Sequence, residues 1–179
     1  FYNTLEKNTT FKKYIGGSPA NIAVGLARLG KKCGFISCVS DDQFGNFAID
    51  TMKSEGIDTT YIMKAKAGEK LGLTFTEILS RTDSSILMYR DSIADLSLTE
   101  DMVNEDYIKK FKAILISGTA LSKSPSREAA LKAVQLSVKT NTPVFFDIDY
   151  REYSWRSREE MALYYHLVAS EASLIIGSR

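Results

Sequence analysis

Short apolar runs alternate with segments of helical pattern along most of this chain. The runs expected as strands are 34–39, 113–116, 144–149 and 174–176. The segments expected as helices are 18–29, 44–53, 99–112, 124–139 and 157–169. Asp42 is the candidate cap of the second, and Ser157 with Glu160 forms a capping box for the last. Strands that alternate with helices of this length favour a parallel sheet with right-handed crossovers. The sequence therefore predicts an α/β fold, with a mostly parallel sheet flanked by helices.

Two strand-like segments interrupt this alternation. Residues 71–79 and 85–90 are rich in Thr, Phe and Ile, and the polar tract 80–84 between them predicts a turn. The two segments are expected to pair antiparallel. They form either an antiparallel edge of the main sheet or a separate small sheet.

The segment 16–30 contains its own helix signals. Ser18 is predicted to be the N-cap, because its hydroxyl oxygen can accept a bond from a free backbone N–H. Pro19 suits the first helical position, where a missing N–H costs nothing. Gly30 suits the left-handed residue that ends a helix. The expected helix therefore has its cap at Ser18 and its first helical residue at Pro19.

A glycine pair precedes this helix and a polar side chain follows in its first turn. Gly16 and Gly17 would let a ligand approach the backbone closely, and Asn21 would lie beside it. The alternative is a helix entry loop with an incidental asparagine. From these residues alone the two interpretations are equally favoured.

Charged side chains follow two of the expected strands, and open α/β sheets bind ligands beyond the carboxyl ends of their strands. If the strand 144–149 continues, Asp147, Asp149 and Arg151 share one face, although spacing alone favours a local ion pair. Tyr89 and Arg90 end the expected hairpin. A guanidinium there could grip a carboxylate through two bonds, or it could be an ordinary exposed arginine.

Composition excludes several classes of function. The 179 residues carry a formal net charge of +1 with both signs interspersed, so no nucleic-acid or membrane surface is expected. Cys33 and Cys38 would point to opposite faces of a strand, and two unpaired thiols suit a reducing cytoplasm. There is no P-loop, no dinucleotide fingerprint and no Cys/His set with metal-ligand spacing. The single histidine, His166, is expected to be a packed or surface residue.

Five runs of sequence, in order along nearly the whole chain, resemble the PfkB/ribokinase family of carbohydrate kinases. They are Gly-Gly-Ser-Pro-Ala-Asn at 16–21, Ser-Asp-Asp-Gln-Phe-Gly at 40–45, Ile-Leu-Met-Tyr-Arg at 86–90, Ser-Gly-Thr-Ala-Leu at 117–121 and Phe-Asp-Ile-Asp-Tyr-Arg at 146–151. The resemblance implies that 1–179 is part of a ribokinase-like domain. It also implies a small β lid over the sugar, with strands within 1–15, 57–64 and 71–90, that often forms a homodimer interface.

The resemblance assigns roles to the candidate residues. In that family the glycine turn and the asparagine, here Gly16, Gly17 and Asn21, hold the sugar. In its sugar-acid kinases a Tyr-Arg element, here Tyr89 and Arg90, contacts the acid.

The strand end at 147–151 resembles an Asp-x-Asn-x-Arg run of related kinases, whose arginine reaches substrate and nucleotide phosphate. Arg151 takes that role here. Asp149 stands where the related pattern has asparagine. The resemblance implies a part in ATP or phosphate binding for Asp149, with a carboxylate in place of the amide.

The implied activity is ATP-dependent phosphorylation of a primary hydroxyl of a sugar acid, with Mg²⁺. The details most resemble members that act on 5-dehydro-2-deoxy-D-gluconate. The alternatives are 2-keto-3-deoxygluconate, a neutral sugar such as fructose or ribose, and a non-catalytic sugar-binding module. In the family the base lies in a Gly-Ala-Gly-Asp segment, which this sequence lacks, so no catalytic base and no metal ligand is expected within it. The chain is interpreted as a fragment cut at both ends, inactive alone, with its base beyond Arg179.

Overall fold

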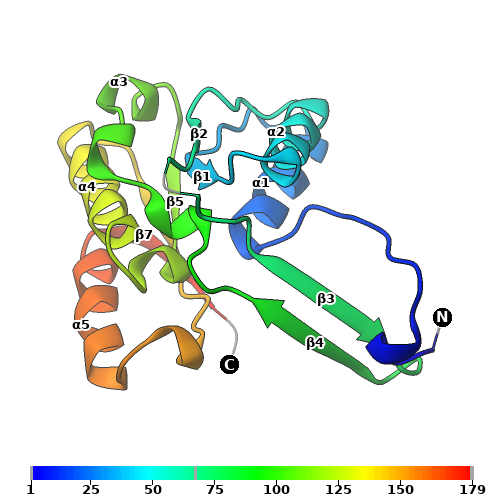
Figure 1. Ribbon diagram of the computed structural model, residues 1–179. Coiled ribbons are helices and arrows are strands. Elements are labelled where there is room, and N and C mark those ends of the chain that lie inside the picture. Colours follow the sequence, from blue (N-terminus) through cyan, green and yellow to red (C-terminus); the bar gives the residue numbers. More distant parts are fainter. Residues whose placement is uncertain (1, 67, 178–179) are drawn as a thin grey trace.

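Strands and helices alternate along the chain in the computed structural model, which describes residues 2–66 and 68–177 (Figure 1). The α-helices are α1 (Ser18–Arg28), α2 (Gln43–Ser54), α3 (Glu105–Ile108), α4 (Ser126–Lys139) and α5 (Arg158–Ala169). The strands are β1 (Ser37–Val39), β2 (Ile62–Lys64), β3 (Leu73–Ile78), β4 (Ser84–Tyr89), β5 (Ile114–Ser117), β6 (Val144–Asp147) and β7 (Ala172–Ile176). Short 3-10 turns are η1 (Leu5–Lys7), η2 (Ala94–Ser97), η3 (Glu100–Met102), η4 (Gly118–Leu121) and η5 (Glu152–Ser154).

Three small sheets organise these strands. β1 pairs with β2 in parallel, and β5, β6 and β7 form a second parallel sheet in that order. β3 and β4 form an antiparallel hairpin that pairs with no other described strand and projects from the body of the molecule (Figure 1). The α/β fold with parallel pairing is confirmed, and the hairpin is a separate small sheet.

The strands of the expected lid lie in different places. β2, within 57–64, pairs with β1 and not with the hairpin. The described part of 1–15 contains η1 and no strand, and it runs beside the hairpin, where the Leu5 N–H donates to Glu77 Oε2 at 2.6 Å (Figure 1). The hairpin, within 71–90, is therefore the projecting element. The boundaries of the lid stay a prediction.

Side-chain caps begin two of the helices where the sequence predicts them. Asp42 accepts bonds from the N–H groups of Phe44 and Gly45 at the start of α2. Ser157 accepts the N–H of Glu160 at the start of α5. Each cap satisfies backbone donors that the first turn leaves free. These local signals set both helix starts.

The start of α1 differs from the prediction. Gly17, not Ser18, is the N-cap, with φ of 99° and no side-chain cap bond. Only glycine adopts such a φ without strain, so the turn occurs one residue earlier than expected. Ser18 lies in the first turn of the helix, and its hydroxyl donates to Asp147 Oδ2 at 2.6 Å. The end of α1 follows the prediction, since Gly30 has φ of 76°.

The segment 99–112 is not one helix. Asn104 has an extended backbone, and its side-chain oxygen accepts the N–H of Tyr107 at 2.9 Å. Asparagine side chains offer the backbone such alternatives to a continuous helix. The segment is therefore divided into η3 and the short helix α3, and the prediction of a single long helix is wrong.

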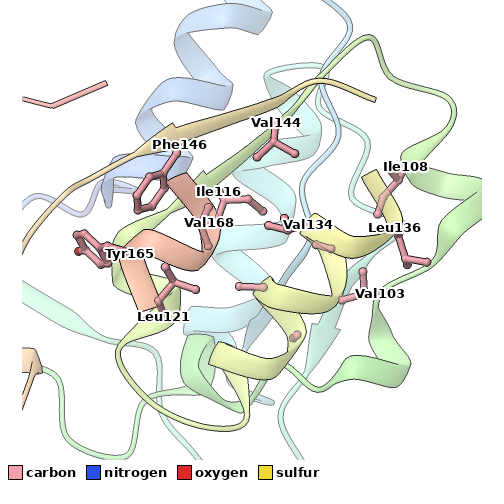
Figure 2. Close-up of a cluster of buried hydrophobic side chains, with 13 residues drawn as sticks. Val103, Ile108, Ile116, Leu121, Val134, Leu136, Val144, Phe146, Tyr165 and Val168 are labelled. Atoms are coloured by element: carbon pink, nitrogen blue, oxygen red, sulfur yellow. The ribbon is translucent and has the colours of Figure 1, made fainter. Parts of the chain in front are cut away.

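Two large cores and one small buried cluster stabilise the part of the fold that the structure describes. The larger packs β5 and β6 against α4 and α5 and contains Phe146, Leu121, Val144 and Val168 (Figure 2). The smaller packs α1 and α2 over β1 and β2. The groups that bind ligands in a fold of this kind lie between such layers, at the ends of the strands.

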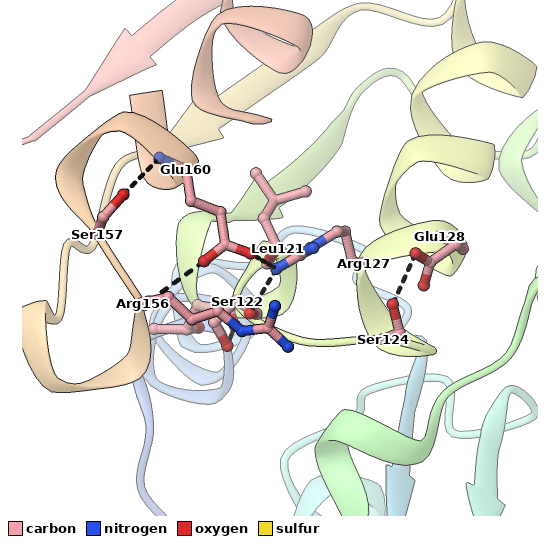
Figure 3. A network of polar contacts seen from close by, with 9 residues as sticks. Leu121, Ser122, Ser124, Arg127, Glu128, Arg156, Ser157 and Glu160 are labelled. Carbon is pink, nitrogen blue, oxygen red and sulfur yellow. Dashed lines mark hydrogen bonds and ion pairs between the residues drawn. The ribbon is translucent and has the colours of Figure 1, made fainter. Parts of the chain in front are cut away.

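A polar network joins the start of α4 to α5. Arg127 donates to the carbonyls of Leu121 and Ser122 at 2.8 and 2.7 Å and to Glu160 Oε1 at 3.2 Å (Figure 3). Its guanidinium lies 3.9 Å from the centre of the Tyr164 ring. The network fixes η4, which follows β5, against α5. Within residues 2–66 and 68–177, no helix is long and apolar enough to cross a membrane.

Candidate active site

One large open cleft of about 2530 Å³ lies between the two cores and the hairpin. Residues from the start of α1, from the hairpin, from the end of β5 and from the loop after β6 line it. Of the predicted site residues, it brings together Gly16, Gly17, Asn21, Arg90, Asp149 and Arg151. Tyr89 is not among its lining residues. The cleft therefore joins three segments that are far apart in the sequence.

The glycine turn presents open backbone to this cleft. A Cβ at Gly16 or Gly17 would meet nothing within 4 Å, so the space beside both residues is free for a ligand. The side chain of Asn21 is exposed and hydrogen-bonds to none of the described residues. Its backbone N–H donates to the Gly17 carbonyl at 2.9 Å, which starts the helix. The amide of Asn21 is thus free to bind hydroxyl groups.

The loop after β6 places two charged groups in the cleft. The strand ends at Asp147, and Asp149 has φ of 29°, in the left-handed region. Asp and Asn tolerate this region better than other residues, so Asp149 and the asparagine of the related pattern meet the same backbone requirement. Arg151 Nη2 lies 2.7 Å from Asp149 Oδ1, and the Asp149 side chain is only 12% exposed.

This turn corrects the prediction that three charged residues share one strand face. The left-handed residue ends the alternation of side chains, so Asp149 and Arg151 line the cleft while Asp147 does not. Asp147 instead accepts the Ser18 hydroxyl. The local ion pair that spacing favoured is present between Asp149 and Arg151, within the cleft.

Two buried residues, Tyr165 and Gly118, pack against the loop after β6. The Tyr165 hydroxyl donates to the Ile148 carbonyl at 2.7 Å. Burial, with a smaller effect of the Asp149 charge, raises the pKa of Tyr165 to about 12, so the hydroxyl keeps its proton. A Cβ on Gly118 would lie 2.0 Å from the Ile148 oxygen. Glycine at 118 therefore lets the loop pack directly on η4.

The end of the hairpin contributes a second arginine. Arg90 Nη2 donates to Asp95 Oδ2 at 2.9 Å, and both residues line the cleft. The Tyr89 ring meets Phe75 edge-on with 6.0 Å between ring centres. Of the adjacent pair Tyr89 and Arg90, only the arginine is among the residues that line the cleft.

The described residues offer no set of groups for a metal ion. Among residues 2–66 and 68–177, no three His, Cys, Asp or Glu side chains cluster in a way that could hold one. Asp149, a carboxylate that lines the cleft, is paired with Arg151. The arrangement supports binding of an anionic, hydroxyl-bearing ligand by this chain's own residues.

Comparison with known families matches residues 1–179 to the pfkB family carbohydrate kinases. The chain belongs to this family. The resemblance carried by its five sequence runs is thereby confirmed.

Curated relatives in this family are similar over nearly the whole chain. A 5-dehydro-2-deoxygluconokinase of Clostridium tetani is 65% identical over 98% of the chain, which covers 52% of that relative. The enzyme of the same name from Clostridium perfringens strain 13 is 63% identical over 99% of the chain and 53% of its own length. The chain therefore spans about half the length of the curated relatives it matches.

Solved structures show the same fold. A sugar kinase of Pyrococcus horikoshii in complex with ATP superposes with a TM-score of 0.85 at 31% identity, covering 98% of this chain and 57% of that one. A PfkB protein of Polaromonas gives a TM-score of 0.88 at 26% identity, over 98% and 59%. The ribokinase-like fold is confirmed.

Sequence reasoning missed two partners of the site residues. Asp95, which pairs with Arg90, follows it by five residues, and only its opposite charge could have suggested the pair. The bond from Ser18 to Asp147 joins residues 129 positions apart, and no local pattern signals it. His166 lies exposed on α5, outside the cleft, as expected.

Proposed function

We propose that the whole protein phosphorylates a primary hydroxyl of a small sugar acid, with 5-dehydro-2-deoxy-D-gluconate as substrate. The observation that carries this is the cleft, in which Arg90 and Arg151 from distant segments face the same space as the glycine turn and Asn21. Two guanidinium groups favour an anionic substrate over a neutral one. The names of the relatives at 54–65% identity support the choice of acid.

We propose ATP as the phosphate donor and Mg²⁺ as the metal ion of this reaction. The similar Pyrococcus sugar kinase was solved with ATP, which supports the same phosphate donor here. Magnesium usually binds through one or two carboxylates together with substrate phosphates. No group of three or more metal-binding side chains is present among the described residues, and we assign none of these residues to the metal. Cys33 and Cys38 are free thiols, which supports a cytoplasmic location.

The proposal is tested by offering the whole protein, with ATP and Mg²⁺, a panel of sugars. The panel contains 5-dehydro-2-deoxy-D-gluconate, 2-keto-3-deoxygluconate, fructose and ribose. We expect the highest kcat/KM with the first. Preference for a neutral sugar would contradict the role of the arginines, and binding without phosphorylation would indicate a sugar-binding module.

Replacement of Arg90 by alanine should raise the KM for the acid without a matching change in the KM for ATP. The loss of a hydrogen bond to a charged group costs about 1.5–3 kcal/mol, which corresponds to about 10- to 150-fold. Steady-state kinetics on the whole protein measures both constants. Arg81→Ala is the matched control, because Arg81 is exposed in the turn of the same hairpin. Equal KM values for the acid in both variants would contradict the assignment.

We also propose a homodimer formed through the hairpin. The alternation of side chains places the exposed residues Ile78, Ile86 and Met88 on one face of the hairpin, and an apolar face of this kind favours association of two copies. Ile86 is 57% exposed, so Ile86→Asp would place a charge in the interface without disturbing a core. Light scattering should then show a dimer for the whole protein and a monomer for the variant. A monomeric parent at micromolar concentration would contradict the proposal.

A further inference from the structure

A single side-chain bond connects the start of α1 to the end of β6. Ser18 Oγ donates to Asp147 Oδ2 at 2.6 Å, and the site is partly buried. The two residues belong to the two segments that frame the cleft. Ser18 follows the glycine turn directly, and Asp147 lies four residues before Arg151.

The bond bridges parts of the molecule that have different cores. α1 packs through Ala20 and Ala23 in the smaller core. β6 packs through Val144 and Phe146 in the larger one. α1 also lies against β5, which pairs with β6, so the two parts are in contact through packing as well. The Ser18–Asp147 bond adds a direct link between the residue that follows the glycine turn and the strand end that precedes the loop after β6.

The start of α1 has little else to hold it. Gly17 caps the helix without a side-chain bond, and both glycines of the turn are open on the side where a side chain would lie. Glycine backbone is freer than that of any other residue, so such a turn needs an external anchor to keep one geometry. The Ser18 hydroxyl provides that anchor.

Asp147 acts from outside the cleft. Ser18 is among the residues that line the cleft, and Asp147 is not. The carboxylate therefore does not face the ligand space and acts through Ser18. A negative charge beside the first turn of α1 also complements the positive end of the helix dipole.

We propose that Ser18 and Asp147 form a positioning pair that sets the glycine turn and Asn21 at the correct distance from Arg151. The pair thereby fixes the distance between the sugar-binding side of the cleft and the phosphate-binding side. The expected change in the KM for the acid rests on the proposed sugar-acid kinase activity. The expected change in the first turn of α1 does not.

The kinetic test uses the whole protein and 5-dehydro-2-deoxy-D-gluconate. Ser18→Ala should raise the KM for the acid by about 10- to 100-fold, the loss expected for a hydrogen bond to a charged group, while the KM for ATP changes much less. Ser18→Thr keeps the hydroxyl and should restore most of the affinity. The double variant Ser18→Ala/Asp147→Ala should be no worse than Asp147→Ala, because residues that act as one unit are not additive.

A second measurement needs no substrate. Hydrogen exchange of the Asn21 amide, which bonds to the Gly17 carbonyl, reports on the first turn of α1. In Ser18→Ala this amide should exchange about ten-fold faster than in the parent, with amides in the centre of α4 unchanged. Ser54→Ala is the control, since Ser54 is exposed at the end of α2 and bonds only to the Thr51 carbonyl.

The two measurements separate failure of the inference from failure of the proposed function. Unchanged exchange at Asn21 in Ser18→Ala, or additive effects of the two single substitutions, would overturn the positioning pair. If the parent phosphorylates no sugar acid while exchange at Asn21 accelerates as expected, the proposed function is wrong and the positioning pair stands.

Discussion

Replacement of Phe146 by alanine should lower the free energy of unfolding by about 3–5 kcal/mol, the range for removal of a fully buried phenylalanine. Phe146 is only 1% exposed and belongs to the larger core (Figure 2). Its ring meets Tyr165 edge-on, with 5.2 Å between ring centres. Alanine would leave a cavity between β6 and α5 that these rigid elements cannot close, and the lost contacts add to the lost burial.

Urea unfolding of the whole protein measures this loss. Phe11→Ala is the matched control: it removes the same side chain from a residue that is 62% exposed beside the hairpin. Its loss should be much smaller, since it gives up little more than one edge-on contact with Phe75. Similar losses in the two variants would mean that the larger core does not depend on Phe146.

The features that the sequence predicted well are those that depend on neighbouring residues. Asp42 and Ser157 cap helices within three residues of themselves, and Gly30 ends α1 through its own backbone. The apolar run before Asp147 predicts a buried strand because every residue in it favours that state. Such signals need no knowledge of distant parts of the chain.

The features that it missed depend on tertiary contacts. Ser18 has the side chain of a good cap, but a glycine directly before it can turn the chain, and its hydroxyl has a stronger partner in Asp147. The segment 99–112 has helical composition, but Asn104 ends it locally. At Asp149 the left-handed backbone cancels the strand alternation on which the shared face depended.

The family motifs predicted which residues line the candidate cleft, and the spacing of charged residues along the chain did not. No local pattern indicates that Asn21, Arg90 and Arg151 line one cleft, because each belongs to a different segment of the chain. The three segments are the start of α1, the end of the separate hairpin and the loop after β6, and only the tertiary fold brings them to the same cleft. Tyr89, which belongs to the same motif as Arg90, is not among the residues that line the cleft, and its role in binding the acid stays a prediction.

Replacement of Arg151 by alanine should reduce kcat for phosphorylation of the acid by about 10²–10³-fold. This is the range for removal of one preorganised group that stabilises charge developing in a transition state. Arg151 is suited to that role because Asp149 already orients its guanidinium within the cleft, 2.7 Å away. Steady-state kinetics at saturating ATP and acid isolates kcat, and the KM values report binding separately.

Two further variants decide what Arg151 contributes. Arg151→Lys keeps the charge and loses the planar fork, so it should recover only a small part of kcat if bidentate contact with phosphate is what matters. Arg158→Ala is the matched control, because Arg158 is 77% exposed and pairs only weakly, at 3.4 Å, with Glu152 after the same loop. Its kcat should equal that of the parent. A full recovery by lysine would reduce the role of Arg151 to a general electrostatic one. Equal losses in Arg151→Ala and Arg158→Ala would show that the loop after β6 takes no direct part in the transfer.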